Sequence, residues 1–134
     1  MTRRDLTPGQ QIAQVAHATT EFAAHNRSAF SYWHTNSQFI IVLAVKDQQE
    51  LSQLANKLEN NDCLVESFKE PDLGNQLTAI AISPKDYEKA KPILSNIPLA
   101  LPPKKVLDEI VVHYNKAHNI TYNFKIQVVQ FFNY

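Results

Sequence analysis

The sequence predicts an α/β fold in three layers, with helices on both faces of a mixed sheet of four or five strands. Segments with helical periodicity alternate along the chain with short apolar segments rich in β-branched residues. Such alternation is typical of a sheet that is covered by helices. In addition, residues 38–45 (QFIIVLAV) form an almost continuous apolar run, as strands buried on both faces do.

The composition is that of one folded domain without extreme charge. Hydrophobic residues make up 44% of the 134 residues, which is enough for a core and excludes wholesale disorder. Thirteen basic residues balance thirteen acidic ones, so a strongly basic arm is excluded but a smaller basic patch is not. The single cysteine, Cys63, excludes an internal disulfide. Apolar runs are too short to cross a bilayer and no secretion signal is visible, so we expect a cytoplasmic protein without membrane contact.

The first helix is predicted to begin with a capping box, after a partial strand within residues 2–6. Thr7 suits the N-cap, Pro8 suits the first helical position, and Gln10 follows Thr7 by three residues. At this spacing the two side chains satisfy each other's backbone N–H groups. The helix is expected to run to about His25.

One face of this helix carries a polar stripe. Its members, at steps of four, three and four residues, are Gln10, Gln14, His17 and Glu21. Side chains at these steps lie above one another on a helix. Taken alone, such a stripe is typical of a solvated helix face.

The remaining elements follow in the order expected of such a sheet. Residues 26–37 are interpreted as a loop or a short helix, and residues 38–45 as a strand. The later predictions are a helix over 47–60, strands over 63–68 and 77–83 joined by a loop over 70–75, and a short helix from Pro84 that Pro92 ends or kinks.

The pattern changes after Pro98, and residues 1–100 are predicted to form one domain with an extension over 101–134. The extension is expected to contain a helix over 104–115 and an alternating strand over 122–128. We expect this strand to complete the sheet. It could do so within the chain or by exchange with a second copy, which would make a homodimer.

Two segments carry a recognisable pattern. Residues 5–18 read DLTPGQQIAQVAHA, and residues 70–80 read EPDLGNQLTAI. In this order they resemble the type II peptidyl-tRNA hydrolase family, the archaeal and eukaryotic type. In that family a glycine-containing turn leads into a helix bearing G-K-x-A-A-Q-x-x-H-A, and a D-x-G-x…T loop precedes the last strand. The resemblance covers roughly residues 3–100.

The resemblance implies hydrolysis of the ester that joins a peptide to the terminal ribose of tRNA, so the implied substrate is peptidyl-tRNA. Asp72 is the carboxylate expected to orient or activate water, and His17 is expected to position groups or act as a base. Gln14, with Gln10 or Thr78, is expected to donate hydrogen bonds to the oxyanion. The expected substrate contacts are Gly9, Gly74, Asn75, Arg3 and Arg4. No metal ion or other cofactor is expected.

A tRNA substrate also requires basic and aromatic partners. Further candidates for phosphate contacts are Arg27, Lys46 and Lys69. If exposed, Tyr32 and Trp33 could stack on the terminal bases. The alternative for these two aromatic residues is a place in the core or over it.

Gln10 stands where well-studied members of the family carry a catalytic lysine. A glutamine carries no charge and does not titrate. The sequence therefore leaves open a second function, a catalytically inactive relative that binds tRNA or a protein partner. A third is a structural or interaction protein in which the extension is the functional part. Gln10 also has a purely structural explanation in the capping box, as Asp72 and Gly74 have in a turn.

Overall fold

The structure is a computed structural model that describes residues 1–100, the first of two units into which the chain divides after Ala100. The predicted helix over 104–115 and strand over 122–128 lie outside the described residues. The described elements are β1 (Thr2–Arg3), α1 (Pro8–His25), α2 (Arg27–Asn36), β2 (Ala44–Val45), α3 (Gln48–Glu59), β3 (Val65–Glu70), the short 3-10 helix η1 (Pro71–Leu73), β4 (Gln76–Ile82), a second 3-10 helix η2 (Pro84–Asp86) and α4 (Tyr87–Leu94).

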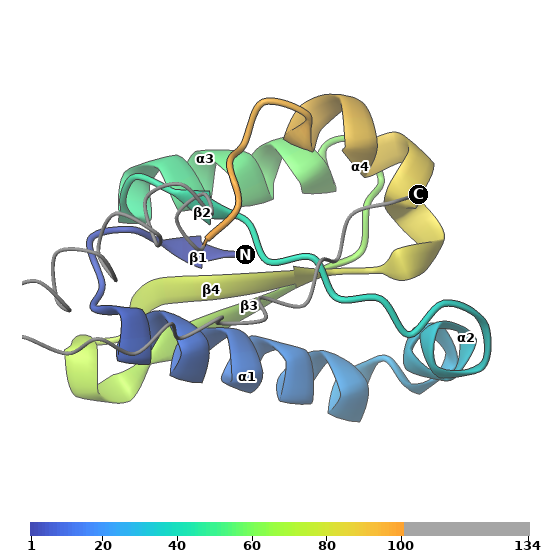
Figure 1. The fold of residues 1–134 in the computed structure, drawn as a ribbon, viewed down its shortest axis with the longest axis horizontal. Helices are drawn as coiled ribbons and strands as arrows, with labels where there is room; N and C mark the ends of the chain where they lie inside the picture. Colours follow the sequence, from blue (N-terminus) through green and yellow to red (C-terminus); the bar gives the residue numbers. More distant parts are fainter. Residues whose placement is uncertain (101–134) are drawn as a thin grey trace, which may run out of the picture. The chain divides into compact units, whose positions relative to one another are not determined.

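The elements form three layers. Helices α1 and α2 lie on one side of the sheet, and α3 and α4 lie on the other (Figure 1). The strand order is β2-β1-β4-β3. Strand β1 is parallel to β2 and antiparallel to β4, and β3 is antiparallel to β4. The predicted α/β class with a mixed sheet is therefore confirmed.

The strand predicted over 38–45 is wrong in extent. Only Ala44–Val45 forms a strand, and Leu43 adds a single bridge to Leu99. Ile40 and Ile41 are 59% and 63% exposed. The register places Ala44 opposite Thr2, so residues 39–41 run past the start of β1 and no described strand pairs with them.

Residues 98–100 occupy the outer edge of β2. The backbone N–H of Ala44 donates to Pro98 O at 3.0 Å, and the N–H of Ala100 donates to Val42 O at 2.9 Å. Arg4 supports this segment, because its guanidinium donates to Leu99 O at 3.1 Å. The backbone of residues 98–100 therefore covers the outer edge of the sheet beside residues 42–44.

The helices follow the local signals closely. The capping box of Thr7 and Gln10 is present, and α1 ends at His25 as predicted. Residues 27–36 form a helix, which confirms the second of the two interpretations of that segment. In α3 the apolar face is buried as expected, and its buried residues are Leu51, Leu54, Ala55 and Leu58. None of the helices within residues 1–100 is long and apolar enough to span a membrane.

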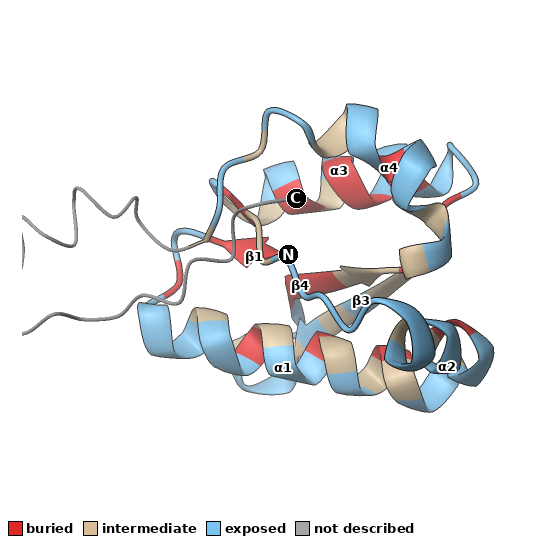
Figure 2. Ribbon diagram, turned by 45° about the vertical axis from the view of Figure 1, so that its right-hand side comes forward, coloured by how far each residue is buried: buried red, intermediate tan, exposed pale blue. Residues whose placement is uncertain are grey.

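The later elements are shifted by a few residues from their predicted bounds. Strand β3 begins at Val65 rather than at residue 63, because the N–H of Leu64 is taken by the Asp86 carboxylate at 2.9 Å. Helix α4 continues two residues past Pro92, to Leu94. The core lies mainly between the sheet and the helices α3 and α4, as the buried positions in Figure 2 show.

Candidate active site

A buried glutamine connects the first helix to the last two strands. Gln14 is only 5% exposed, although it belongs to the polar stripe of α1. Its side-chain oxygen accepts a hydrogen bond from the Thr78 hydroxyl at 2.6 Å, and its amide nitrogen donates to the Glu70 carboxylate at 2.7 Å. A buried amide needs both partners. The pair of contacts therefore fixes which way the amide points.

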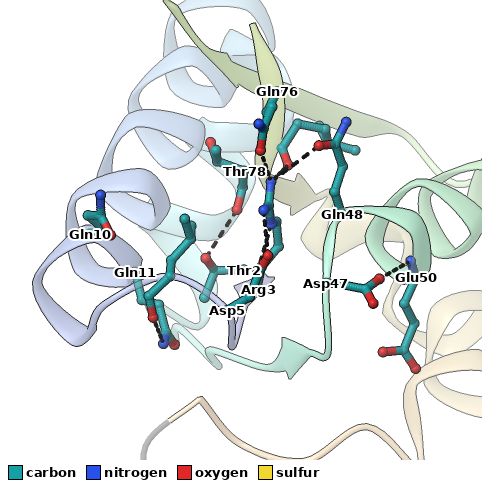
Figure 3. Close-up of polar contacts among 12 residues, drawn as sticks. Thr2, Arg3, Asp5, Gln10, Gln11, Asp47, Gln48, Glu50, Gln76 and Thr78 are labelled. Carbon is teal, nitrogen blue, oxygen red and sulfur yellow. Dashed lines mark hydrogen bonds and ion pairs between the residues drawn. The ribbon is translucent and has the colours of Figure 1, made fainter. Parts of the chain in front are cut away.

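Thr78 is itself held from the opposite direction. It is fully buried on β4, and its backbone oxygen accepts a hydrogen bond from the Thr2 hydroxyl at 3.1 Å (Figure 3). Three elements therefore meet at this point, since Thr2 lies on β1, Thr78 on β4 and Gln14 on α1. Hydrogen bonds connect Thr78 in the buried sheet to Gln14, and Gln14 to Glu70 at the half-buried end of β3.

His17 lies one helical turn after Gln14 and faces the same strand. Its ring stacks on Phe68 with 4.6 Å between ring centroids and 7° between planes. His17 is exposed at its outer side, so its ring nitrogens, each able to donate or accept a hydrogen bond, are open to a ligand. The polar stripe of α1 thus contacts β3 at two residues, since Gln14 bonds to Glu70 and His17 stacks on Phe68.

The loop after β3 is shaped to present Glu70. The second Glu70 carboxylate oxygen accepts from the Asp72 N–H at 3.4 Å, and Glu70 O accepts from the Asn75 N–H at 2.9 Å. Gly74 and Asn75 both have positive φ, 66° and 59°, a conformation that glycine and asparagine adopt most readily. Their role here is to close the turn after η1.

Glu70 is ionised more readily than an ordinary glutamate. The hydrogen bond from Gln14 is the largest cause that lowers the pKa of Glu70, and the Asp72 N–H and the nearby His17 act in the same direction. A group that donates to the charged form stabilises it. Glu70 is therefore an acceptor of hydrogen bonds at neutral pH.

The Asp72 side chain does not join this group. It is exposed, whereas the carboxylate that contacts Gln14 is that of Glu70. Glu70 is the carboxylate beside Gln14 that the sequence motifs do not single out. The signal in the sequence is the spacing of two residues along the strand, which places Glu66, Phe68 and Glu70 on one face. In the structure all three contact residues at or near α1.

Gln10 and Gly9 stand apart from this group. The Gln10 side-chain oxygen accepts from the Thr7 N–H at 3.0 Å and from the Thr7 hydroxyl at 2.9 Å. Within residues 1–100 the hydrogen bonds of the Gln10 side chain go to Thr7 alone. Gly9 lies in the first turn of α1, and a Cβ there would meet nothing within 4 Å.

Arg3 is buried in a network of its own. It is 5% exposed and makes a two-pronged contact with Asp5 at 2.9 and 2.6 Å. It also donates to Gln76 and to Leu77 O, both at 3.0 Å (Figure 3). Its outer neighbour is Gln48, at the start of α3, at 3.5 Å. Arg3 therefore faces the α3 side of the sheet, opposite to Gln14.

A comparison with protein families shows to which family the chain belongs. A family model described as "Peptidyl-tRNA hydrolase PTH2" matches residues 2–100. The chain belongs to the PTH2 family of peptidyl-tRNA hydrolases. Among individual relatives, a peptidyl-tRNA hydrolase of Nanoarchaeum equitans is 29% identical over 105 residues, which cover 71% of this chain and 90% of that protein.

The residues that match the family model include both α1 and the loop after β3, and therefore every candidate site residue. In the first turn of α1, the side chain of Gln10 takes part in the capping box. The side chains that meet are amides, a hydroxyl, an imidazole and a carboxylate. Such a group suits the positioning of water and of an ester carbonyl. Within residues 1–100, no cluster of His, Cys, Asp or Glu side chains is arranged to hold a metal ion.

Proposed function

We propose that this chain hydrolyses the ester bond of peptidyl-tRNA and that Glu70 supplies the carboxylate of the site. The observation that supports this most is the hydrogen-bonded chain from Thr78 through Gln14 to Glu70. Family membership supports the reaction and the substrate.

In this proposal Glu70 orients the attacking water. A carboxylate can accept about four hydrogen bonds, and the described partners of Glu70 are Gln14 and the Asp72 N–H. A water molecule can therefore donate to the same carboxylate. The lowered pKa makes Glu70 a weak base, which favours orientation of water over storage of its proton.

His17 is proposed as the group that contacts the substrate. The water oxygen bonds to the ester carbonyl carbon as one water proton passes to the His17 ring. The bond to the ribose oxygen then breaks as that oxygen takes the proton from His17, which regenerates the neutral ring. Stacking on Phe68 holds the ring in place. Gln14 and Thr78 are buried and act through Glu70, so they are positioning residues.

The test is turnover of an N-blocked aminoacyl-tRNA by wild type and by two variants of the same loop. Glu70→Gln should lower kcat by about 10²–10⁴-fold, because it removes the charge that orients water. Asp72→Asn is the matched control and should leave kcat within about threefold, because the Asp72 side chain is exposed. The reverse result would place the carboxylate role on Asp72. A wild type without turnover would contradict the hydrolase function itself.

A third variant examines the departure at Gln10. Gln10→Lys restores a cation one turn before Gln14, as the resemblance to well-studied members implies. We expect kcat to rise, because a cation near the ester stabilises the oxyanion. We expect α1 to lose about 1 kcal/mol, since the capping partner is removed and a positive charge is added at a helix N-terminus. An unchanged kcat would indicate that this site works without a cation at that position.

A further inference from the structure

The segment around α2 carries no negative charge. Residues 22–46 contain none of the thirteen acidic residues of the chain, yet they include Arg27, at the start of α2. An acid-free stretch of this kind gives a surface that attracts polyanions.

Most of α2 faces solvent. Ala29 is the one buried residue in this helix, and Figure 2 shows the rest of α2 as intermediate or exposed. Tyr32 is 46% exposed. An exposed aromatic ring of this kind is a surface on which a nucleic-acid base can stack.

A lysine from a distant part of the chain joins this face. The Lys85 ammonium lies 5.6 Å from the centre of the Tyr32 ring and donates to the Ser28 hydroxyl at 3.2 Å. In the described part of the chain, the ion pairs involve neither Arg27 nor Lys85. The adjacent Asp86 carboxylate is directed elsewhere, to the Leu64 N–H and to Lys89.

Two carboxylates border this face and are already engaged. Glu66 accepts from the Asn26 side chain at 3.0 Å and contacts His25 at 3.2 Å. Glu21 contacts the other ring nitrogen of His25 at 3.5 Å. Glu21 and Glu66 both contact His25, at the end of α1 that is next to α2, whereas Glu70 contacts Gln14 nearer the start of α1.

We propose that Arg27, Tyr32 and Lys85, here called the α2 platform, bind the tRNA part of the substrate. Phosphates contact Arg27 and Lys85, and a base stacks on Tyr32. This inference rests on the proposed function. Gln14 and His25 are eleven positions apart on α1, which is about 16 Å along the helix axis. A few nucleotides of a tRNA end can bridge that distance, so the ester can lie at the site while the RNA lies on the platform.

Charge favours RNA over a protein on this face. Ile40 and Ile41 are exposed nearby in the sequence and would suit an apolar partner, but the platform itself consists of Arg27 at the start of α2 and of Lys85 over the Tyr32 ring. Cations that contact phosphates, together with an exposed aromatic ring, are the combination with which proteins bind single-stranded nucleic acid. A protein partner is the outcome that the experiment must separate.

The test is binding of deacylated tRNA at several salt concentrations, measured by fluorescence anisotropy. The double variant Arg27→Ala/Lys85→Ala should weaken binding and lower the salt slope by about two, one for each cation removed from a phosphate. The control is Lys57→Ala/Lys91→Ala, which removes the same charge from α3 and α4 on the other side of the sheet. An equal effect of both doubles, or no effect of the first, would overturn the proposal.

A second pair of variants tests stacking. Tyr32→Ser should weaken tRNA binding by about tenfold, whereas Tyr32→Phe should bind as wild type does. If Tyr32→Ser leaves tRNA affinity unchanged and alters the oligomeric state, the face is a protein interface and the proposal is wrong. Binding that depends on the platform, without ester turnover, would contradict only the hydrolase function. Normal turnover with an unchanged KM in the platform variants would contradict only the platform.

Discussion

The carboxylate of Glu70 accepts a 2.7 Å hydrogen bond from the side-chain amide of Gln14, which lies 56 residues earlier in the chain. This contact joins the first helix to the end of β3. It also lowers the pKa of Glu70, because donation to the ionised form is the largest cause of that shift. The same bond therefore links the position of a carboxylate to its protonation.

The pH dependence of Glu70 follows from the direction of that shift. The folded-state pKa is below the unfolded value, so ionised Glu70 stabilises the fold at neutral pH and loses this effect as the pH falls through the lowered pKa. In a carboxyl NMR titration Glu70 should titrate below an ordinary glutamate. In Gln14→Ala its pKa should move upward. An unchanged titration in that variant would show that Gln14 is not the cause.

Thr78→Val is expected to destabilise the protein and to lower activity. The change keeps the shape of the side chain but leaves the buried Gln14 oxygen without its donor, which costs about 1–3 kcal/mol. Urea unfolding measures the first effect and kcat the second. Thr78→Ser retains the hydroxyl, so its activity should stay near wild type. A Ser variant as inactive as the Val variant would contradict the positioning role.

Replacement by lysine should affect the free energy of unfolding at Arg3 but hardly at Arg4. Arg3→Lys replaces a planar fork that contacts Asp5, Gln76 and Leu77 O with a single ammonium, so the free energy of unfolding should fall by about 2 kcal/mol. Arg4→Lys should change it by less than about 0.5 kcal/mol, because Arg4 makes one exposed hydrogen bond. Equal effects in thermal unfolding would show that the Arg3 network adds nothing to stability.

The two glycines should also differ. Gly74→Ala meets no atom within 4 Å, but its φ of +66° should cost about 1–2 kcal/mol. Gly9→Ala lies within a helix with equally open space and should stabilise it by up to about 1 kcal/mol. The turnover of Gly9→Ala also tests the predicted substrate contact at Gly9. A loss of activity in a stable Gly9→Ala protein would support the predicted substrate contact at this glycine, and normal activity would contradict it.

What the sequence could predict is mostly local. The Thr7–Gln10 capping box and the apolar face of α3 depend on spacings of three and four residues, and both are present. The strand over 38–45 was wrong in extent because β pairing depends on a partner. Here the partner is β1, which is only two residues long.

Sequence motifs single out Asp72 as the candidate carboxylate, whereas in the structure the carboxylate that contacts Gln14 is that of Glu70. Gln14, His17 and Thr78 follow from motifs on single elements, and the structure brings Gln14 and Thr78 together. The choice between Glu70 and Asp72 depends on how the chain turns after β3, where Gly74 and Asn75 have positive φ. The role of Arg3 depends in the same way on contacts more than 70 residues distant, which no local pattern contains.

Strand β1 has a consequence for how the molecule is made. Thr2 is paired with Ala44 on one side and with Ala79 on the other, so the strand that precedes α1 lies in the middle of the sheet. The centre of the sheet closes only when β4 is available. Such long-range closure slows folding. Until then, the apolar faces of α1 and α3 have no complete sheet on which to pack.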